Sequence, residues 1–241
     1  YLKCFWDWCI SEDLIPGEKH PLAGLKKRKV QGRIVQLEER EVARLLKQPD
    51  PTRYTGIRDH ALMCLQIDTG IRPNEALQLV PDDFKADKQE ITVRAEISKT
   101  RQARTLPISA PTAKEILTLL QVRPKEWGNV NIFCSENGSP FSVSAWSKRV
   151  VDYSKSAGLE RLTSYSLRHT AALLLLRRGG NAFTVQRMLG HADMQMTRHY
   201  INLTCEDMRR NHSQAGVINA LLHEEKGNNA PKMQRIRIIK K

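Results

Sequence analysis

The stretch Thr69–Leu77 reads Thr-Gly-Ile-Arg-Pro-Asn-Glu-Ala-Leu and predicts the end of one helix followed at once by the start of another. Gly70 suits the cap after a helix, because glycine adopts a left-handed backbone conformation at no steric cost. Pro73 is favoured at the first position of a helix. Arg72 therefore precedes a helix start, where unpaired backbone N–H groups and a guanidinium together favour an anion. The stretch predicts an anion-binding junction between two helices.

Helical periodicity extends over most of the chain. Apolar spacing and capping residues predict helices over 2–10, 37–46, 58–69, 74–80, 112–122, 144–157, 167–178 and 182–189. Two short runs, 91–95 and 105–108, have the β pattern and indicate an antiparallel pair with Lys99 near its turn. The fold class that we expect is mainly α with a small antiparallel β-sheet.

The charge balance points to a polyanionic partner. The 241 residues include 39 Lys and Arg against 26 Asp and Glu, a formal net charge of +13. Nucleic acid is the commonest partner of such a protein, and a basic surface that serves only solubility is the alternative. No apolar run is long enough to span a membrane. The five cysteines form no Cys-x-x-Cys pair, which disfavours a zinc site or a disulfide framework and favours a reducing cytoplasm.

The two ends of the chain differ from its centre. Residues 2–10 place three large aromatic side chains on a short helix, and no initiator Met precedes them, so we expect the last helix of a domain excised from a longer chain. A linker with Pro and Gly follows, and its basic run suits a phosphate backbone: Lys26, Lys27, Arg28 and Lys29. We expect the main body over 30–215 and a C-terminal helix and basic tail over 216–241.

Three further motifs carry polar residues at predicted turns and helix ends. Ser98-Lys99-Thr100 puts a lysine on the hairpin, and Tyr165-Ser166-Leu167-Arg168-His169-Thr170 puts a second arginine at the start of an apolar helix. Leu189-Gly190-His191 ends a helix, and Tyr200 follows nine residues later. Alone, each motif has a structural interpretation: a capping arginine, a turn lysine, a surface charge, a structural histidine or a packed tyrosine.

Taken together and in this order, the four motifs resemble the tyrosine recombinase, or phage integrase, family. Thr69–Glu75 is similar to its first arginine box, Lys99 to its β-hairpin lysine, Ser166–Thr170 to its second arginine box, and Leu189–His191 with Tyr200 to its terminal histidine and nucleophile. The resemblance implies the catalytic fold of that family. It also implies a site-specific DNA recombinase that cleaves and rejoins strands through a 3′-phosphotyrosyl intermediate.

The resemblance covers residues 30–215, and residues 1–29 resemble the end of the family's DNA-clamping core-binding domain. The partners that it implies are double-stranded DNA and other protomers of the same protein, in a tetramer on DNA, with accessory DNA-bending proteins as a further class. It implies no cofactor, no metal and no membrane association. The expected location is the cytoplasm, at the nucleoid.

The resemblance assigns a role to each catalytic position. Tyr200 would attack the scissile phosphate, and Arg72 and Arg168 would bind that phosphate. Lys99 would protonate the departing 5′-oxygen, and His191 would donate a hydrogen bond to the phosphate. These residue types suit phosphodiester cleavage, because guanidinium groups offset the charge that gathers on the non-bridging oxygens and a poor alkoxide leaving group needs a proton. A phosphotyrosyl ester conserves the bond energy for rejoining.

Several supporting positions complete the expected site. Glu75 would orient a catalytic base or an arginine from behind the phosphate-binding residues. Direct DNA contacts are expected from the linker cations 26–29 and from Arg101 and Arg104. Tyr165 stands where the family usually has a histidine, and a tyrosine is a much poorer base near neutral pH. His169 could compensate in part, although we expect it to face another side of the helix.

Two other functions fit the same sequence. The helices 167–178 and 182–189 could form a helix-turn-helix that binds DNA without cutting it, as in a catalytically impaired relative of the family. A type IB topoisomerase, which relaxes DNA by similar chemistry, is the second alternative. We assign Leu173–Leu176, Trp127 and Trp146 to packing, with no part in the chemistry.

Overall fold

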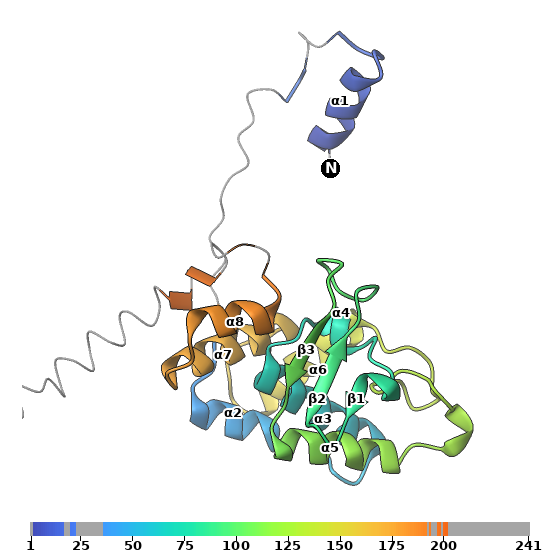
Figure 1. Ribbon diagram of the computed structural model, residues 1–241, viewed down its shortest axis with the longest axis vertical. Helices are drawn as coiled ribbons and strands as arrows, with labels where there is room; N and C mark the ends of the chain where they lie inside the picture. Colours follow the sequence, from blue (N-terminus) through green and yellow to red (C-terminus); the bar gives the residue numbers. More distant parts are fainter. Residues whose placement is uncertain are drawn as a thin grey trace, which may run out of the picture. The chain divides into compact units, whose positions relative to one another are not determined.

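The structure, a computed structural model, describes residues 2–16, 20–22, 36–191, 193, 197, 198, 200 and 201. The chain divides into two compact units, Tyr1–Arg33 and Ile34–Lys241 (Figure 1). The basic run 26–29 and the tail 216–241 lie outside the described residues. The DNA contacts expected from Lys26, Lys27, Arg28 and Lys29 therefore stay predictions.

The smaller unit contains one helix among its described residues, α1 at Leu2–Ser11, which confirms the predicted helix at this end. Its large side chains Phe5 and Trp8 are exposed. The imidazole of His20 lies with Nε2 3.0 Å from Oδ1 of Asp7 and so ties the following turn to the helix.

Helix α3, Tyr54–Thr69, forms the centre of the larger unit. It packs against α5, Ala110–Gln121, and against α7, Ser164–Arg177. Leu62 and Leu65 of α3 are fully buried, as expected for a helix that neighbours enclose on several sides. The hydrophobic core of the unit therefore lies around α3.

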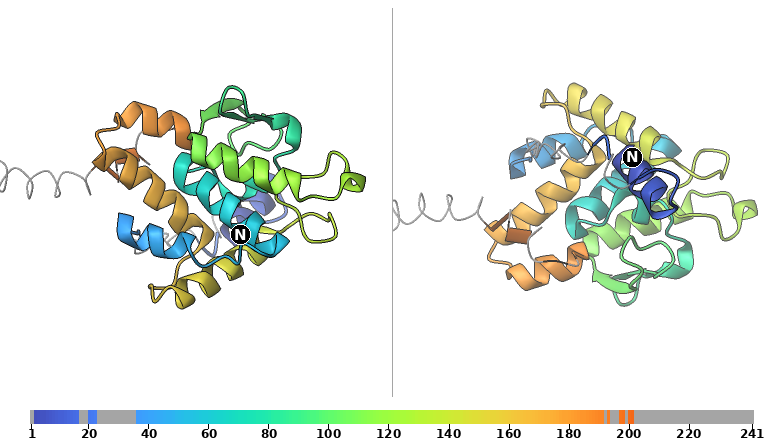
Figure 2. Two further views of the ribbon diagram at one scale, coloured as in Figure 1. Left: turned by 90° about the horizontal axis from the view of Figure 1, so that it is seen from below. Right: turned by 90° about the horizontal axis from the view of Figure 1, so that it is seen from above.

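The remaining helices surround this core. They are α2 at Glu39–Leu46, α4 at Pro73–Ala76, α6 at Val143–Ser156 and α8 at Ala182–Leu189. Helices α2 and α4 contact α3, whereas α6 and α8 contact α7. Figure 2 shows α7 and α8 side by side. Short 3₁₀ turns occupy Pro81–Asp83 and Lys125–Trp127.

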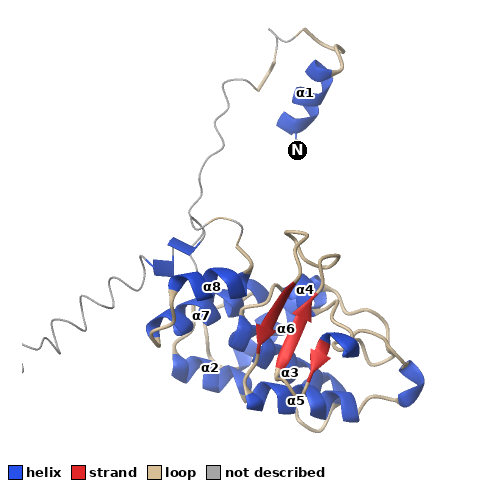
Figure 3. Cartoon of the chain, viewed as in Figure 1, coloured by secondary structure: helices blue, strands red, loops and turns tan. Residues whose placement is uncertain are grey.

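A three-stranded antiparallel sheet lies beside the helices, in the order β1-β2-β3 (Figure 3). Its strands are β1 at Phe84–Lys85, β2 at Glu90–Val93 and β3 at Arg104–Pro107. Ile91 pairs with Leu106, and both side chains are buried against the helices. The connection from β2 to β3 carries Lys99.

The predicted fold class is confirmed, with two local differences. The helix predicted over 74–80 is wrong in length, since α4 makes a single turn and ends at Ala76. Pro81 holds the preceding Val80 in extended backbone, with φ −107° and ψ 162°, and this conformation excludes a longer helix. Strand β1 is additional, because two residues are too few to show an alternating pattern. The other predicted helices and strands are present with ends shifted by a few residues.

The residues that we assigned to packing, Trp146, Trp127 and Leu173, do pack against other side chains. Trp146 is fully buried, and its Nε1 donates a hydrogen bond of 2.7 Å to Oε1 of Gln66. Trp127 packs edge-on against Tyr54 with ring centroids 5.4 Å apart. Leu173 is buried as well.

Gly70 ends α3 in the left-handed region, at φ 66°, and its N–H donates to the Gln66 carbonyl. This cap turns the chain toward Arg72. A Cβ atom at Gly70 would lie 2.5 Å from Cδ2 of Leu189, which is itself buried. Glycine is therefore required here for its backbone conformation and for its small size.

We expect Gly70→Ala to destabilise the protein more than Gly158→Ala. Gly158 has nearly the same conformation, φ +63°, but a Cβ there would meet nothing within 4 Å. Gly158→Ala should lose about 1 kcal/mol through backbone strain alone, whereas Gly70→Ala should lose a further 1–3 kcal/mol, roughly, through overpacking against Leu189. Urea unfolding at equilibrium measures both losses, and equal losses would contradict the close approach to α8.

Candidate active site

The carboxylate of Glu75 connects three segments that are distant along the chain. Its side chain is 1% exposed, and Oε1 accepts a hydrogen bond of 2.9 Å from Nη1 of Arg72. Oε2 accepts one of 2.5 Å from Nη2 of Arg104 on β3. The backbone N–H of Lys99 lies 3.4 Å from Oε1. Glu75 thus ties the start of α4 to the β2–β3 hairpin.

The charge state of Glu75 follows from these contacts. Burial by itself would raise the pKa of the carboxyl group, but the hydrogen bond and charge of Arg104 and the charge of Arg72 outweigh burial and lower it. Glu75 is therefore ionised at neutral pH.

Arg168 from α7 is buried between the end of α3 and the end of α8. Its Nη1 donates to the Gly70 carbonyl at 2.6 Å, and its Nη2 donates to the Leu189 carbonyl at 2.7 Å. Arg72 reaches the neighbouring carbonyl of Gly190 with Nη2 at 2.9 Å. Burial, reinforced by the charge of Arg72, lowers the pKa of Arg168 to about 10, so the guanidinium keeps its proton at neutral pH. The two arginines meet at one turn and form an electropositive site that favours an anion.

His191 follows this turn directly. Its Nδ1 lies 3.0 Å from Oγ1 of Thr197, a fully buried residue. Burial, then the charges of Arg168 and Arg72, lower the pKa of His191 to about 4. The imidazole is therefore neutral near pH 7, and it can donate a hydrogen bond through only one of its nitrogens.

Tyr200 lies beside this group and is 4% exposed. Its ring packs among apolar residues of α7 and α8, and it stacks almost parallel to the ring of His191, with centroids 6.3 Å apart. Its Oη lies 2.7 Å from Nδ1 of His169. Burial raises the pKa of the phenol, and the charge of Arg168 opposes this in part. The phenol is therefore protonated at neutral pH.

Two of the expected catalytic residues, Lys99 and Tyr165, are exposed and do not join the buried arginine cluster with their side chains. Lys99 is anchored to the cluster through its backbone, and its side chain is exposed on the hairpin. Tyr165 is 48% exposed on the first turn of α7. Arg101 is exposed beside Lys99 and has a positive φ of 56°.

Two residues lie closer to the expected chemistry than the sequence indicated. The side chain of Arg104, which we expected to contact DNA, is 12% exposed; it pairs with Glu75, and its Nε donates to the Met188 carbonyl at 3.3 Å. His169, which we expected to face another side of the helix, contacts Tyr200. No local pattern separates His169 from a surface histidine, because its contact comes from a segment thirty-one residues away.

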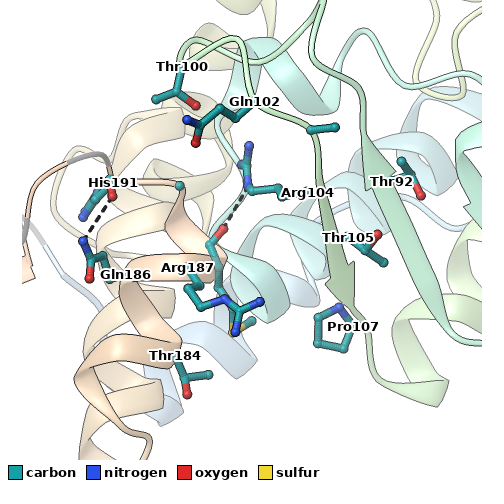
Figure 4. Close-up of a pocket in the computed structure, with 13 residues that line it drawn as sticks. Thr92, Thr100, Gln102, Arg104, Thr105, Pro107, Thr184, Gln186, Arg187 and His191 are labelled. Carbon is teal, nitrogen blue, oxygen red and sulfur yellow. Dashed lines mark hydrogen bonds between the residues drawn. The ribbon is translucent and has the colours of Figure 1, made fainter.

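A cavity of about 820 Å³ opens between the β2–β3 hairpin and α8, beside the arginine cluster. Figure 4 shows Arg104 and His191 at its edge, with Arg187 and Gln186 from α8 and Thr105 from β3 around it. This lining of cations and hydrogen-bond donors suits a polyanion better than an apolar ligand.

The described residues contain no group of three or more His, Cys, Asp or Glu side chains arranged to hold a metal ion. Within the same parts of the chain, no helix is long and apolar enough to cross a membrane.

Comparison with known proteins gives a family match over most of this chain. The model of the phage integrase family matches residues 36–207. The tyrosine recombinase XerD of Staphylococcus epidermidis is 30% identical over 183 residues, which cover 74% of this chain and 61% of the relative. XerC of Alcanivorax borkumensis is 34% identical over 151 residues, which cover 61% and 48%. The chain therefore spans about three fifths of the length of XerD.

Solved structures agree with this result. The crystal structure of XerA recombinase has a TM-score of 0.67 at 23% identity and covers 89% of this chain and 82% of its own, which shows a shared fold. XerH recombinase, bound to a palindromic difH substrate after cleavage, has a TM-score of 0.62 at 26% identity and covers 81% and 56%.

We expect Glu75→Gln to destabilise the protein by about 3 kcal/mol, because it leaves two partly buried guanidinium groups without their counter-charge. The matched control is Glu39→Gln, which removes an exposed carboxylate paired with Arg178 and should cost less than about 1 kcal/mol. Equilibrium unfolding in urea at pH 7 measures both. The lowered pKa of Glu75 means that its contribution is present above pH 4.5, the ordinary value, and is lost as the pH falls further. Equal losses in the two variants would contradict this role for Glu75.

Proposed function

Because this chain belongs to the phage integrase family, we propose that it is a site-specific DNA recombinase that cleaves and rejoins DNA strands through a 3′-phosphotyrosyl intermediate. The observation that carries the proposal is the meeting of Arg72, Arg168, His191 and Tyr200 around the turn at Leu189–Gly190. These side chains come from four segments that are separate in the sequence, and a simple structural role for each residue does not explain why they meet at one turn.

Phosphate binding is the first task of the site. The two guanidinium groups are held in place by backbone carbonyls and by Glu75, so they need little rearrangement when a phosphodiester arrives. Such fixed cations stabilise the charge that develops on the non-bridging oxygens, and the loss of one donor of this kind costs about 3 kcal/mol in other enzymes. His191, neutral near pH 7, adds a hydrogen-bond donor rather than a further charge.

Strand cleavage then proceeds by attack of the Tyr200 oxygen on phosphorus. The phenol gives its proton to a base as the new O–P bond forms, the bond from phosphorus to the 5′-oxygen breaks, and the 5′-oxygen takes a proton from Lys99. The Lys99 ammonium suits this step, because it is exposed on a loop whose backbone Glu75 anchors beside the arginines. Rejoining reverses each step, with the phenolate as leaving group.

We infer double-stranded DNA as the substrate and further copies of the chain as partners, in a tetramer on DNA. Supporting this, the net charge is +13, and XerH and a lambda integrase dimer have been solved on their DNA sites. Residues 1–29 would be the end of a core-binding domain, and the chain would act in the cytoplasm at the nucleoid. Accessory DNA-bending proteins would be further partners.

One observation favours a second candidate, a relative that binds DNA without cutting it. Tyr200 is 4% exposed and its hydroxyl group is already hydrogen-bonded, so the residues packed around it must move before a phosphate can reach its oxygen. The covalent adduct separates the two candidates, because only the recombinase forms one.

We expect the protein to form a covalent adduct with a nicked DNA duplex, and we expect Tyr200→Phe to abolish the adduct while DNA binding persists. The DNA that flanks the coding region supplies the candidate site, and denaturing electrophoresis detects the adduct. The control is Tyr54→Phe, which also removes a partly buried tyrosine hydroxyl and should keep the adduct. Tight binding without any adduct would show the DNA-binding module instead.

We expect Lys99→Ala to slow cleavage on the order of 100-fold and a 5′-phosphorothiolate substrate to restore the rate, because a thiolate leaves without a proton. The control is Arg72→Ala, which the same substrate should not rescue, since phosphate binding is then impaired. Single-turnover rates of adduct formation measure both variants. If sulfur fails to rescue Lys99→Ala, Lys99 is not the general acid.

A further inference from the structure

We propose that His169 is a catalytic residue, the base that takes the phenolic proton of Tyr200 during cleavage and returns it during rejoining. This inference rests on the proposed function and assigns the proton acceptor of that reaction. The position at which the family usually has a histidine is occupied here by Tyr165, so the acceptor must be sought among other residues.

The geometry of the contact is that of a hydrogen bond ready for proton transfer. Nδ1 of His169 lies 2.7 Å from Oη of Tyr200, and the ring centroids are 5.8 Å apart at an angle of 42°. This separation is typical of a hydrogen bond with a hydroxyl donor. With the imidazole neutral and its proton on Nε2, Nδ1 accepts the phenolic hydrogen.

Tyr200 needs such a partner because of its surroundings. It is 4% exposed and packs against Leu173, Val185 and Leu189, which leaves bulk water poorly placed to take its proton. Burial disfavours the phenolate and raises the pKa of the phenol. A base that already contacts Oη can take the proton as the O–P bond forms, which offsets the unfavourable formation of a buried phenolate.

Other candidate bases fit less well. Tyr165 is 48% exposed, and a neutral phenol hardly accepts a proton near pH 7. The ring of His191 lies nearly parallel to that of Tyr200, with centroids 6.3 Å apart, and its Nδ1 is engaged by Oγ1 of Thr197 at 3.0 Å. The carboxylate of Glu75 is engaged by Arg72 and Arg104.

The protons balance over the whole step. The Tyr200 proton moves to Nδ1 of His169, Oη bonds to phosphorus, and the 5′-oxygen leaves with a proton from Lys99. His169, which follows Arg168 in the sequence, becomes an imidazolium, and His191 lies nearby as a neutral group. The bound phosphodiester supplies the negative charge that offsets this new cation. In rejoining, the phenolate recovers its proton from His169.

Single-turnover adduct formation on the nicked duplex tests the proposal with two variants. His169→Asn places an amide oxygen near the position of Nδ1 and keeps a hydrogen bond to Tyr200, but it cannot take a proton. His169→Ala removes the side chain and leaves space for imidazole from the buffer. We expect both to form the adduct about 100-fold more slowly than wild type with unchanged DNA affinity, and imidazole to accelerate His169→Ala.

His60→Asn is the matched control, because His60 lies on α3 with Nδ1 3.1 Å from Glu115, and it should keep the wild-type rate. A wild-type rate in His169→Asn would show that only the hydrogen bond matters, and a His169→Ala variant that imidazole does not accelerate would also overturn the proposal. If the wild-type protein itself forms no adduct, the proposed function fails, and this inference fails with it. An adduct in wild type that is equally fast in His169→Asn overturns the inference alone.

Discussion

Three guanidinium groups crowd around the end of α8, and the buried carboxylate of Glu75 is the anion that holds two of them there. Like charges at this distance repel, so Arg72 and Arg104 would turn toward solvent without a counter-charge. Glu75 compensates only part of the positive charge, and Arg168 is bound by neutral carbonyls. Of the three arginines, Arg104 lines the cavity beside α8, together with Arg187. By fixing the guanidinium groups of Arg72 and Arg104, the buried carboxylate of Glu75 keeps the site ready to bind an anion.

The position of Tyr200 gives the second feature of the site. The ring is held by apolar packing against α7 and α8, its hydroxyl group contacts His169, and its plane lies nearly parallel to that of His191. A phenol held in this way is shielded from water and stays protonated. In the proposed reaction a phosphate reaches its oxygen only when this packing yields, so access to Tyr200 is a condition for cleavage separate from the electrostatics of the arginines.

Local rules explain why much of the fold could be predicted. Gly70 and Pro73 set the junction of α3 and α4. The side chains of Ser109, Ser142 and Thr163 each accept a backbone N–H group from the first turn of α5, α6 and α7. Strand β1 and the single turn of α4 escaped prediction, because such short elements depend on the strands and prolines beside them.

The sequence by itself determined the types of residue at the site, their order and the caps that aim them, since these depend on neighbours within a few positions. It indicated Arg72, Arg168, His191 and Tyr200 as one group. Only the tertiary structure decided that Arg104 pairs with Glu75 and that His169 meets Tyr200. The physical reason is that both contacts join segments about thirty residues apart, and the packing of whole helices and strands, which no local pattern records, fixes which side chains meet.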